Sequence, residues 1–510
     1  MKLFIINHTY RFAAEEAMIS LLGAAPTDTV ECDDYPENAD AALVTRIEGI
    51  SEGRAYATLS VGGKGYAATV DFDSDGLDLP EGFELPADRV EASTAPTAVR
   101  ELVRRRQHAL KLAIAHAISA YKPLGAWGAL TGMRPTKLAR RLIRQSSGFA
   151  AMTELTDRYL LSPDRASMTV RAASAGLAAE EALGENGYLL YLGVPFCPSR
   201  CKYCSFVSES VGASGSLIEP YVEKLLEEIR LRGEIMRSSG LVPRAIYIGG
   251  GTPTTLSPEQ LRRVCSALFD AFRPPEGVEF TVEAGRPDTI DREKLLALKD
   301  SSVTRISINP QSLNPTALKL AGRPHSPEQF FDAFALAREV GFGTINTDLI
   351  AGLDGDTPYT FADTLSRILE LKPENLTIHT LARKRGSTLN RVATESAEVV
   401  TNPAAVKMVD AAYPLLMRSG YSPYYLYRQK YMVAPLENTG WSLPGHDCVY
   451  NSLIMDEVGF CPALGAGGMS KLVSGELVER VSNPKFAAEY IAHDFAKSGE
   501  TLSNWLSRNY

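Results

Sequence analysis

The chain has 510 residues, of which 45% are hydrophobic and 22% charged, and its formal net charge is −8. This length predicts two or three domains, and the acidic balance disfavours nucleic acid as the main partner. No apolar run approaches the roughly 20 residues that cross a bilayer. The first residues also lack the basic flank, apolar stretch and cleavage site of a secretory signal. We therefore expect a cytoplasmic protein without a membrane span.

Residues 1–180 are predicted to form an N-terminal α+β domain. Up to about residue 90 we expect strands and turns, because apolar and polar residues alternate in three segments. Two helices and a linker are expected after them. The strand segments are TRIEGIS, RAYATLSV and KGYAATVDF; the helices are 95–121 and 136–146; the linker is AAEEALGENG at 178–187.

Charge is unevenly distributed along this domain. Residues 1–95 carry 18 acidic and 6 basic side chains, whereas residues 96–145 carry 11 basic and 1 acidic. The basic segment could face an anionic ligand, an acidic partner or nucleic acid. The alternative, which we favour, is a pair of amphipathic helices whose cationic faces meet the acidic part of the same chain.

Residues 181–395 alternate strands with helices. Six such units predict an α/β fold whose parallel sheet forms an open, partial (β/α)6 barrel with helices outside. In such folds functional groups lie at the carboxyl ends of the strands. The predicted strands are 188–194, 245–250, 279–284, 304–309, 344–350 and 375–380.

Residues 396–510 are predicted to be a C-terminal extension that covers the substrate. It begins with a helix around 403–419 and contains the segments PYYLYRQKYM, NTGWSLPGHDCVYN and ALGAGGMSK. Their aromatic, glycine and amide residues are not typical of a plain helical bundle.

Seven cysteines, an odd number, do not suggest a disulfide framework. Cys197, Cys201 and Cys204 follow the first barrel strand in the segment YLGVPFCPSRCKYCSF. Three thiolates in this C-x3-C-x2-C spacing can hold three irons of a [4Fe–4S] cubane and leave the fourth open. Zinc and three unrelated buried thiols are the alternatives. Zinc would need a second pair of ligands that the sequence does not offer.

Polar and glycine residues follow the later strands. YIGGGTPTTL, at residues 247–256, ends the second strand, and three glycines there can adopt unusual backbone angles and expose backbone groups at close range. Taken singly, each polar residue could equally be a capped or paired surface group. The polar residues, in chain order, are Glu283, Gln311, Arg323 and Asp348.

The cysteine motif followed by these groups resembles the radical S-adenosylmethionine superfamily. Tyr191 six residues before Cys197, then GGGTP and the four polar residues, resembles the oxygen-independent coproporphyrinogen III oxidases across residues 188 to about 385. The segments LTGMRPTK, YYLYRQK and LGAGGMSK are similar to the HemZ-type coproporphyrinogen dehydrogenases over most of the chain.

The resemblance implies cofactors, partners and residue roles. The three cysteines would ligate the cluster, and Tyr191 would be a catalytic residue that packs near the sulfonium of S-adenosylmethionine. A tetrapyrrole would be the substrate, and a flavodoxin or ferredoxin the electron donor. A 5′-deoxyadenosyl radical would take hydrogen from a propionate, and loss of carbon dioxide and an electron would leave a vinyl group. Residues implied to contact the cofactor are Tyr191, Tyr203, Gly250, Gly251, Thr252, Glu283, Gln311, Arg323, Asp348, Ala382 and Met469.

Phe206 departs from the best-characterised oxidases, which carry a further cysteine at that position. Relatives that share the phenylalanine include haem chaperones, so a haem carrier is an alternative to the enzyme, as is another tetrapyrrole-modifying or an RNA-modifying radical enzyme. Candidate substrate cations are Arg383, Lys384, Arg385, Arg428 and Lys430, and candidate haem ligands are His379, His446 and Cys448. We favour porphyrinogen oxidation because the N-terminal domain is absent from the chaperones.

Overall fold

A computed structural model describes residues 1–36, 41–86, 91, 95–131, 134–206, 208–382, 402–429, 432–474 and 477–509. The chain forms two compact units, Met1–Gly132 with Leu142–Met168, and Met133–Arg141 with Thr169–Tyr510. Within the described ranges, no helix is both long enough and apolar enough to cross a membrane.

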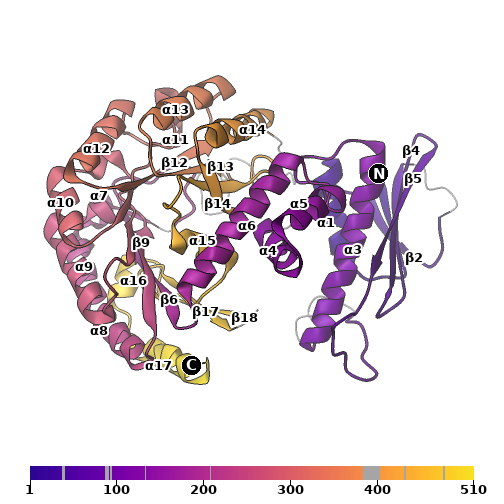
Figure 1. Ribbon diagram of the computed structural model, residues 1–510, viewed down its shortest axis with the longest axis horizontal. Coiled ribbons are helices and arrows are strands. Elements are labelled where there is room, and N and C mark those ends of the chain that lie inside the picture. The colour runs from indigo at the N-terminus through magenta and orange to yellow at the C-terminus, as the bar shows by residue number, and fades with distance from the viewer. Residues whose placement is uncertain are drawn as a thin grey trace. The chain divides into compact units, whose positions relative to one another are not determined.

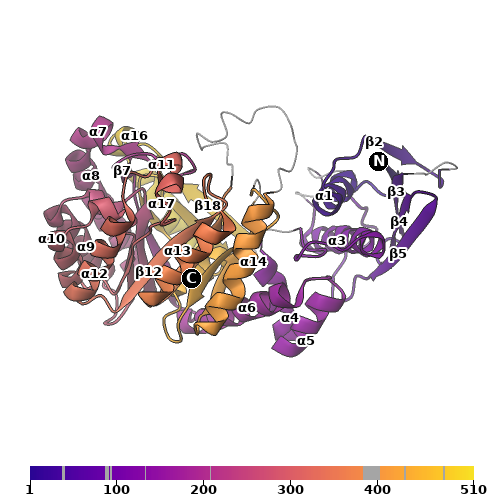
Figure 2. The same ribbon diagram turned by 90° about the horizontal axis from the view of Figure 1, so that it is seen from above.

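The first unit is a five-stranded sheet with helices on one face. Its elements are β1 (Lys2–Ile6), α1 (Arg11–Leu22), β2 (Asp28–Cys32), β3 (Ala42–Glu48), β4 (Gly53–Val61), β5 (Lys64–Phe72), α3 (Thr97–Tyr121) and α5 (Gly148–Asp157). The strand order is β2-β1-β3-β4-β5, and β1 is parallel to both of its neighbours. Figure 2 shows α1 and α3 on the same side of this sheet.

The three strands predicted in this unit are confirmed as β3, β4 and β5. The expectation that residues before 90 form only strands and turns is wrong at α1. There, four small or flexible apolar residues (Ala13, Ala14, Ala17 and Met18) share one helix face and are buried in the core of the unit. Burial of that face stabilises a helix in a segment whose local sequence pattern does not by itself indicate one.

Basic residues of α3 contact acidic and carbonyl groups of the same unit. Arg105 Nη1 lies 2.9 Å from Asp73 Oδ1, and Lys111 pairs with Glu16. Arg106 is buried and donates to the backbone oxygens of Gly49 and Ile50. Contacts of this kind are what we expect if the cationic faces of residues 96–145 meet the acidic part of the same chain.

The second unit holds most of the chain. Its elements up to the sixth barrel strand are α6 (Pro163–Leu183), β6 (Gly187–Val194), β7 (Phe196–Cys197), β8 (Glu209–Ser210), α7 (Val211–Ser214), α8 (Ile218–Ser238), β9 (Val242–Gly250), α9 (Pro258–Phe272), β10 (Glu279–Val282), α10 (Arg292–Asp300), β11 (Arg305–Ser307), α11 (Pro315–Ala321), α12 (Pro327–Val340), β12 (Thr344–Ala351), α13 (Pro358–Glu370) and β13 (Asn375–Thr380). The later ones are α14 (Pro403–Arg418), β14 (Ser422–Tyr427), β15 (Asn438–Ser442), α15 (Val449–Asp456), β16 (Ala463–Gly465), β17 (Met469–Ser474), β18 (Leu477–Ser482), α16 (Ala487–Ile491) and α17 (Ala496–Asn509). Helices α4 (Pro135–Gln145) and α6 contain residues of both units.

The predicted partial barrel is confirmed. All six predicted strands are present, and they lie side by side in chain order within a nine-stranded sheet, β14-β15-β13-β12-β11-β10-β9-β6-β16. Each of the six is parallel to the next. Strand β16 extends one edge in parallel, and antiparallel β15 and β14 extend the other, so the sheet stays open. The carboxyl ends of the six parallel strands therefore share one edge.

Helices cover the outer face of this sheet and α15 lies on its inner side. Figure 1 shows α8, α9, α10, α12 and α13 around the outside of the strands. Capping boxes begin three of them, with Ser257 and Gln260 at α9, Ser326 and Gln329 at α12, and Thr357 and Thr360 at α13. Each box satisfies backbone N–H groups where a loop from the carboxyl edge enters a helix.

The predicted linker at 178–187 is wrong for its first half. Residues up to Leu183 complete α6, and Ala179 and Leu183 are buried in one cluster with Leu189, Ala245 and Leu453. The alanine- and glutamate-rich sequence favours a helix, and packing against β6, β9 and α15 fixes it in place.

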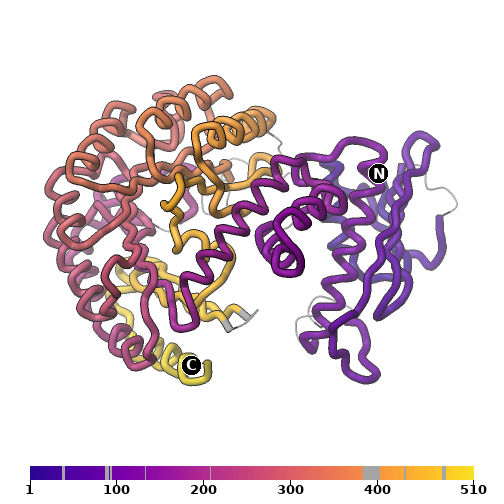
Figure 3. Tube along the Cα trace, viewed as in Figure 1, coloured from indigo at the N-terminus to yellow at the C-terminus, as the bar shows by residue number. Residues whose placement is uncertain are grey.

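The C-terminal segment lies beside α8, as the yellow end of the tube in Figure 3 shows. The carboxylate of Glu228 on α8 is fully buried and accepts from Gly465 N at 2.8 Å, Asn483 Nδ2 at 2.8 Å and Tyr490 O–H at 2.5 Å. One buried acid therefore fixes the end of β16, the residue after β18 and helix α16 against α8.

A buried ion pair in this unit gives a stability prediction. Asp456 accepts from Arg140 Nη1 at 2.9 Å and from Thr136 Oγ1 at 2.5 Å, and both charged side chains are 5% exposed. Asp456→Ala should lower the free energy of unfolding by about 3 kcal/mol, because it leaves a buried guanidinium without this partner. Urea unfolding measures the effect. Asp71→Ala, which breaks an exposed pair with Arg54, is the control and should leave the curve unchanged.

Candidate functional site

The three clustered cysteines lie on the loop after β6. Cys197 ends β7, Cys201 is buried with 8% exposed, and the backbone N–H of Cys204 donates to Cys201 O at 3.2 Å. Burial raises the pKa of Cys204 to about 11, and the negative charges of the other two thiolates add to the rise. The loop thus holds three thiols close enough to repel one another as thiolates, which a bound cation would relieve.

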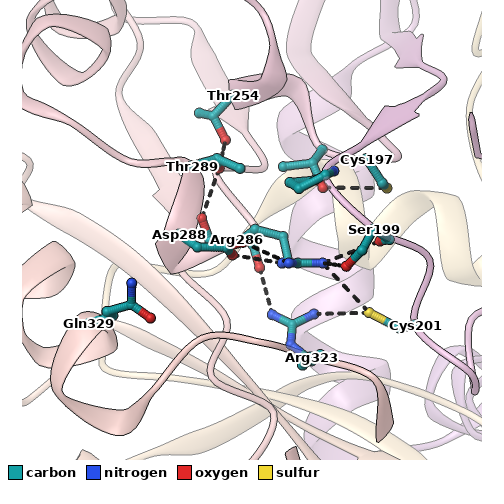
Figure 4. Close-up of polar contacts among 12 residues, drawn as sticks. Cys197, Ser199, Cys201, Thr254, Arg286, Asp288, Thr289, Arg323 and Gln329 are labelled. Carbon is teal, nitrogen blue, oxygen red and sulfur yellow. Dashed lines mark hydrogen bonds and ion pairs between the residues drawn. The ribbon is translucent and has the colours of Figure 1, made fainter. Parts of the chain in front are cut away.

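Polar side chains surround two of these thiols, as Figure 4 shows. Arg323 Nη1 lies 3.8 Å and Arg286 Nη1 4.0 Å from Cys201 Sγ, and the Thr252 hydroxyl donates to Cys197 Sγ at 3.5 Å. Both arginines are buried. Donors of this kind favour the ionised, ligand-binding form of a thiol.

The glycine segment after β9 contacts the cysteine loop through its backbone. Gly251 N donates to Val194 O and Thr252 N to Phe196 O, each at 2.7 Å. Gly250 has a φ of +105°, and a Cβ on Gly251 would lie 2.5 Å from Phe196 O. Glycine is therefore required at both positions for the two strand ends to approach this closely.

One carboxylate, Glu283, directly follows β10, and another, Asp348, lies within β12. Tyr247 O–H donates to Glu283 Oε1 at 2.6 Å, and Asn346 Nδ2 donates to Asp348 Oδ1 at 2.8 Å. Burial raises the pKa of Glu283 to about 7; the Tyr247 hydrogen bond opposes that rise and the Asp348 charge adds to it. For Asp348, burial acts to raise the pKa, but the hydrogen bond and charge of His379 hold it below its usual value.

Gln311 and Tyr191 complete the group on this edge. Gln311 has a φ of +67°, its N–H donates to Asp348 O at 3.0 Å, and its buried Oε1 has no hydrogen-bond partner among the described residues. An unpaired buried carbonyl oxygen of this kind fits a bound polar ligand. The Tyr191 ring stacks with Tyr247 at 6.4 Å and Tyr450 at 6.3 Å, and burial raises its pKa, so its phenol is neutral.

Other predicted residues differ in how they connect to the thiols. Arg323 Nη1 donates to Tyr203 O–H at 3.2 Å, which joins Tyr203 to the group. Ala382 bridges to Met432, and Met469 begins β17 with 45% exposed; no described contact joins either of them to the thiols.

Candidate substrate and haem residues are only partly described. Arg383, Lys384, Arg385 and Lys430 lie outside the described residues. Arg428 Nε donates to Leu436 O at 3.2 Å, His446 Nδ1 lies 3.1 Å from Thr344 Oγ1, and Cys448 Sγ donates to Glu279 Oε1 at 3.3 Å. His446 and Cys448 thus have partners that compete with a haem iron.

Comparison with known proteins gives consistent matches. Residues 191–368 match the Radical SAM superfamily. The oxygen-independent coproporphyrinogen-III oxidase-like protein HemZ of Bacillus subtilis is 36% identical over 370 residues, 71% of this chain and 74% of that protein. The heme chaperone HemW of Lactococcus lactis is 31% identical over 283 residues, 55% of this chain and 69% of that protein. The solved structure of the coproporphyrinogen III oxidase HemN of Escherichia coli, a radical SAM enzyme, has the same fold, with a TM-score of 0.50 and 23% sequence identity. The match covers 63% of this chain and 73% of that chain.

The chain belongs to the oxygen-independent coproporphyrinogen III oxidase family of radical SAM proteins.

Family membership implies a [4Fe–4S] cluster and S-adenosylmethionine, and the donor set fits both. No group of three or more His, Cys, Asp or Glu in the described ranges could hold a single metal ion. A cubane cluster does not need three ligands around a single metal ion, because each thiolate binds a different iron. The unpaired Gln311 Oε1 and the carboxylates of Glu283 and Asp348 suit a polar, cationic ligand beside it.

Three residues at the site were missed from the sequence: Arg286, Tyr247 and Asn309. Arg286 stands three positions after Glu283 in the loop beyond β10, and Tyr247 precedes Gly249 by two positions and so faces the same side of β9. Asn309 accepts from Arg323 Nη2 through its backbone oxygen and from Asp348 N through Oδ1, at 2.6 and 3.2 Å. Strand alternation could have singled out Tyr247, but no local pattern marks the other two.

The cysteine loop gives a direct test of cluster binding. Cys197→Ser, Cys201→Ser and Cys204→Ser should each lose most of the iron and sulfide that the anaerobically reconstituted chain retains, because a missing thiolate frees one corner of the cluster. Iron and sulfide analysis measures this. Cys32→Ser, on β2 of the first unit, is the matched control and should retain the wild-type content. Full retention in the three variants would contradict the assignment.

Glu283 gives a pH prediction. Between the ordinary pKa of 4.5 and the folded value of about 7, the folded chain holds a proton that the unfolded chain releases. Stability should therefore fall as pH rises through this window, by up to about 3 kcal/mol from this residue. Glu283→Gln should lose less stability between about pH 4.5 and 7.5 than the wild type, in urea unfolding of the cluster-free chain. If the stability of the wild type and of Glu283→Gln changes equally with pH, the raised pKa of Glu283 is contradicted.

Proposed function

We propose that the chain catalyses the oxygen-independent oxidative decarboxylation of coproporphyrinogen III to protoporphyrinogen IX in haem biosynthesis. The observation that carries the proposal is the cysteine loop of β6 lying against the glycine segment of β9 in a chain that matches the HemZ protein over 71% of its length. Glu283 follows β10, Gln311 follows β11 and Asp348 lies within β12, so the three come from neighbouring strands and complete one polar group.

Each part of the site then has a chemical role. When bound, the cluster and S-adenosylmethionine supply a 5′-deoxyadenosyl radical that takes hydrogen from a propionate of the substrate. Cys197, Cys201 and Cys204 would hold three irons, and the glycine segment would offer backbone groups to the methionine end of the cofactor. Glu283 and Asp348 would accept hydrogen bonds from the ribose hydroxyls. The Tyr191 ring, which stacks with Tyr247 and Tyr450, would exclude water and face the sulfonium.

The proposal includes domains, location and partners. We assign residues 1–180 to an N-terminal domain, 181–395 to the radical SAM core and 396–510 to a region that covers the substrate. The boundary at 395 lies outside the described residues. All seven cysteines are free thiols, which suits the reducing cytoplasm. A flavodoxin or ferredoxin would supply the electron.

Haem carriage is the second candidate, and Phe206 favours it. This residue takes the position of the extra cysteine of the characterised oxidases, and its side chain is 65% exposed beside the cysteine loop. Three of the matching relatives, from different bacteria, are named heme chaperones. An exposed phenylalanine ring could pack on a porphyrin face.

Product analysis separates the two functions. The reconstituted, reduced chain should convert coproporphyrinogen III to the divinyl product and form about two 5′-deoxyadenosines per product without oxygen, because one radical is needed for each vinyl group. Mass spectrometry and chromatography measure both. Cys201→Ser is the matched negative control. Formation of deoxyadenosine with an unchanged tetrapyrrole, or stoichiometric haem binding without turnover, would reject the oxidase.

A further inference from the structure

Cys201 differs from the other two clustered cysteines in its surroundings. Two guanidinium groups approach its Sγ, Arg323 Nη1 at 3.8 Å and Arg286 Nη1 at 4.0 Å. Cys197 Sγ instead faces the neutral hydroxyl of Thr252. Two buried guanidinium groups therefore lie next to the buried thiol of Cys201 (Figure 4).

Arg286 is held in this position by several bonds. Its Nε and Nη2 donate to the two carboxylate oxygens of Asp288 at 2.8 and 2.7 Å. Its Nη1 donates to the backbone oxygen and the hydroxyl of Ser199 at 3.3 and 3.2 Å. With 3% of its side chain exposed, the guanidinium cannot turn toward water. Asp288 offsets part of its charge, and Nη1 is held beside Cys201 Sγ.

The other charged groups nearby are few. Arg323 Nη2 donates to the backbone oxygens of Gly285 and Asn309 at 3.0 and 2.6 Å, so its described partners leave its positive charge in place. Burial lowers the pKa of His325 to about 3, so this side chain is neutral at pH 7. Arg286, Arg323 and Asp288 are thus the charged groups near Cys201 from the loops after β10 and α11, and Arg200 and Lys202 flank it on the cysteine loop itself.

Such charges affect the redox state of a cluster. Reduction by one electron adds negative charge to a cluster already bound to thiolates. N–H donors and positive charge at a ligand sulfur favour the reduced form, whereas a carboxylate disfavours it. The effect is large in a buried site because water and salt screen it little.

We propose that Arg286 is a positioning residue that raises the reduction potential of the cluster through Cys201, and that Asp288 limits this rise. The inference rests on cluster binding by the three cysteines and is independent of the choice between porphyrinogen oxidation and haem carriage. A higher reduction potential makes electron transfer from a low-potential donor protein to the cluster more favourable.

Potentiometric titration of the full-length reconstituted chain, without S-adenosylmethionine and followed by low-temperature EPR, tests this. Arg286→Met should make the midpoint potential more negative, by about a tenfold change in the reduction equilibrium, or about 59 mV for one electron. Asp288→Asn should make it more positive, because the guanidinium charge is no longer offset. Arg286→Lys, which keeps the charge with fewer donors, should fall between the wild type and Arg286→Met.

Arg338→Met is the matched control. Arg338, on α12, pairs with Glu374 at 2.9 Å, and removing it should leave the potential unchanged. A role of Arg286 in loop structure alone predicts loss of iron and sulfide in its variants and an unshifted potential in Asp288→Asn, and that result would overturn the inference. If Arg286→Met does not retain a cluster, the midpoint potential of Asp288→Asn tests the inference: a shift to a more positive potential supports it, and any other result overturns it. Absence of any cluster in the wild type would reject the cluster assignment itself and the inference with it.

Discussion

Two backbone hydrogen bonds between the ends of β6 and β9 are the constraint on which the site depends. Gly251 N and Thr252 N donate to Val194 O and Phe196 O, and this contact is possible only because no side chain stands at Gly251. The cysteine loop begins at that contact. A Cβ would push the glycine segment away from the thiols, and with it the hydroxyl that donates to Cys197.

The order of the parallel strands extends this contact into a site. Because β6, β9, β10, β11, β12 and β13 are neighbours in chain order, side chains that follow each strand meet along one edge of the sheet. Arg323 connects the two ends of the group: it contacts Cys201, and the backbone oxygen that it binds belongs to Asn309, whose side chain accepts from Asp348 N. The thiols and the carboxylates are thus parts of one hydrogen-bonded arrangement.

The later part of the chain completes the sheet that carries this edge. Strand β16 pairs with β6, and β15 pairs with β13, so strands from the part of the chain after residue 400 extend both edges of the six-stranded core. Tyr450, from α15, stacks on Tyr247 at 4.5 Å, and Tyr247 in turn holds Glu283. A residue from the C-terminal region thereby supports a carboxylate of the core.

The sequence by itself determined the six parallel strands, the open barrel and the cysteine loop, because strand alternation, glycine runs and C-x3-C-x2-C spacing are local patterns. Glu283, Gln311, Arg323 and Asp348 were also predicted from their positions in or after the strands. Only the tertiary structure decided that Arg286 faces Cys201, that Tyr247 donates to Glu283, that α1 is a helix and that α6 continues to Leu183. Each of these depends on contacts between residues far apart in the chain, and the energy of burial and hydrogen bonding across such distances leaves no periodic trace in the sequence.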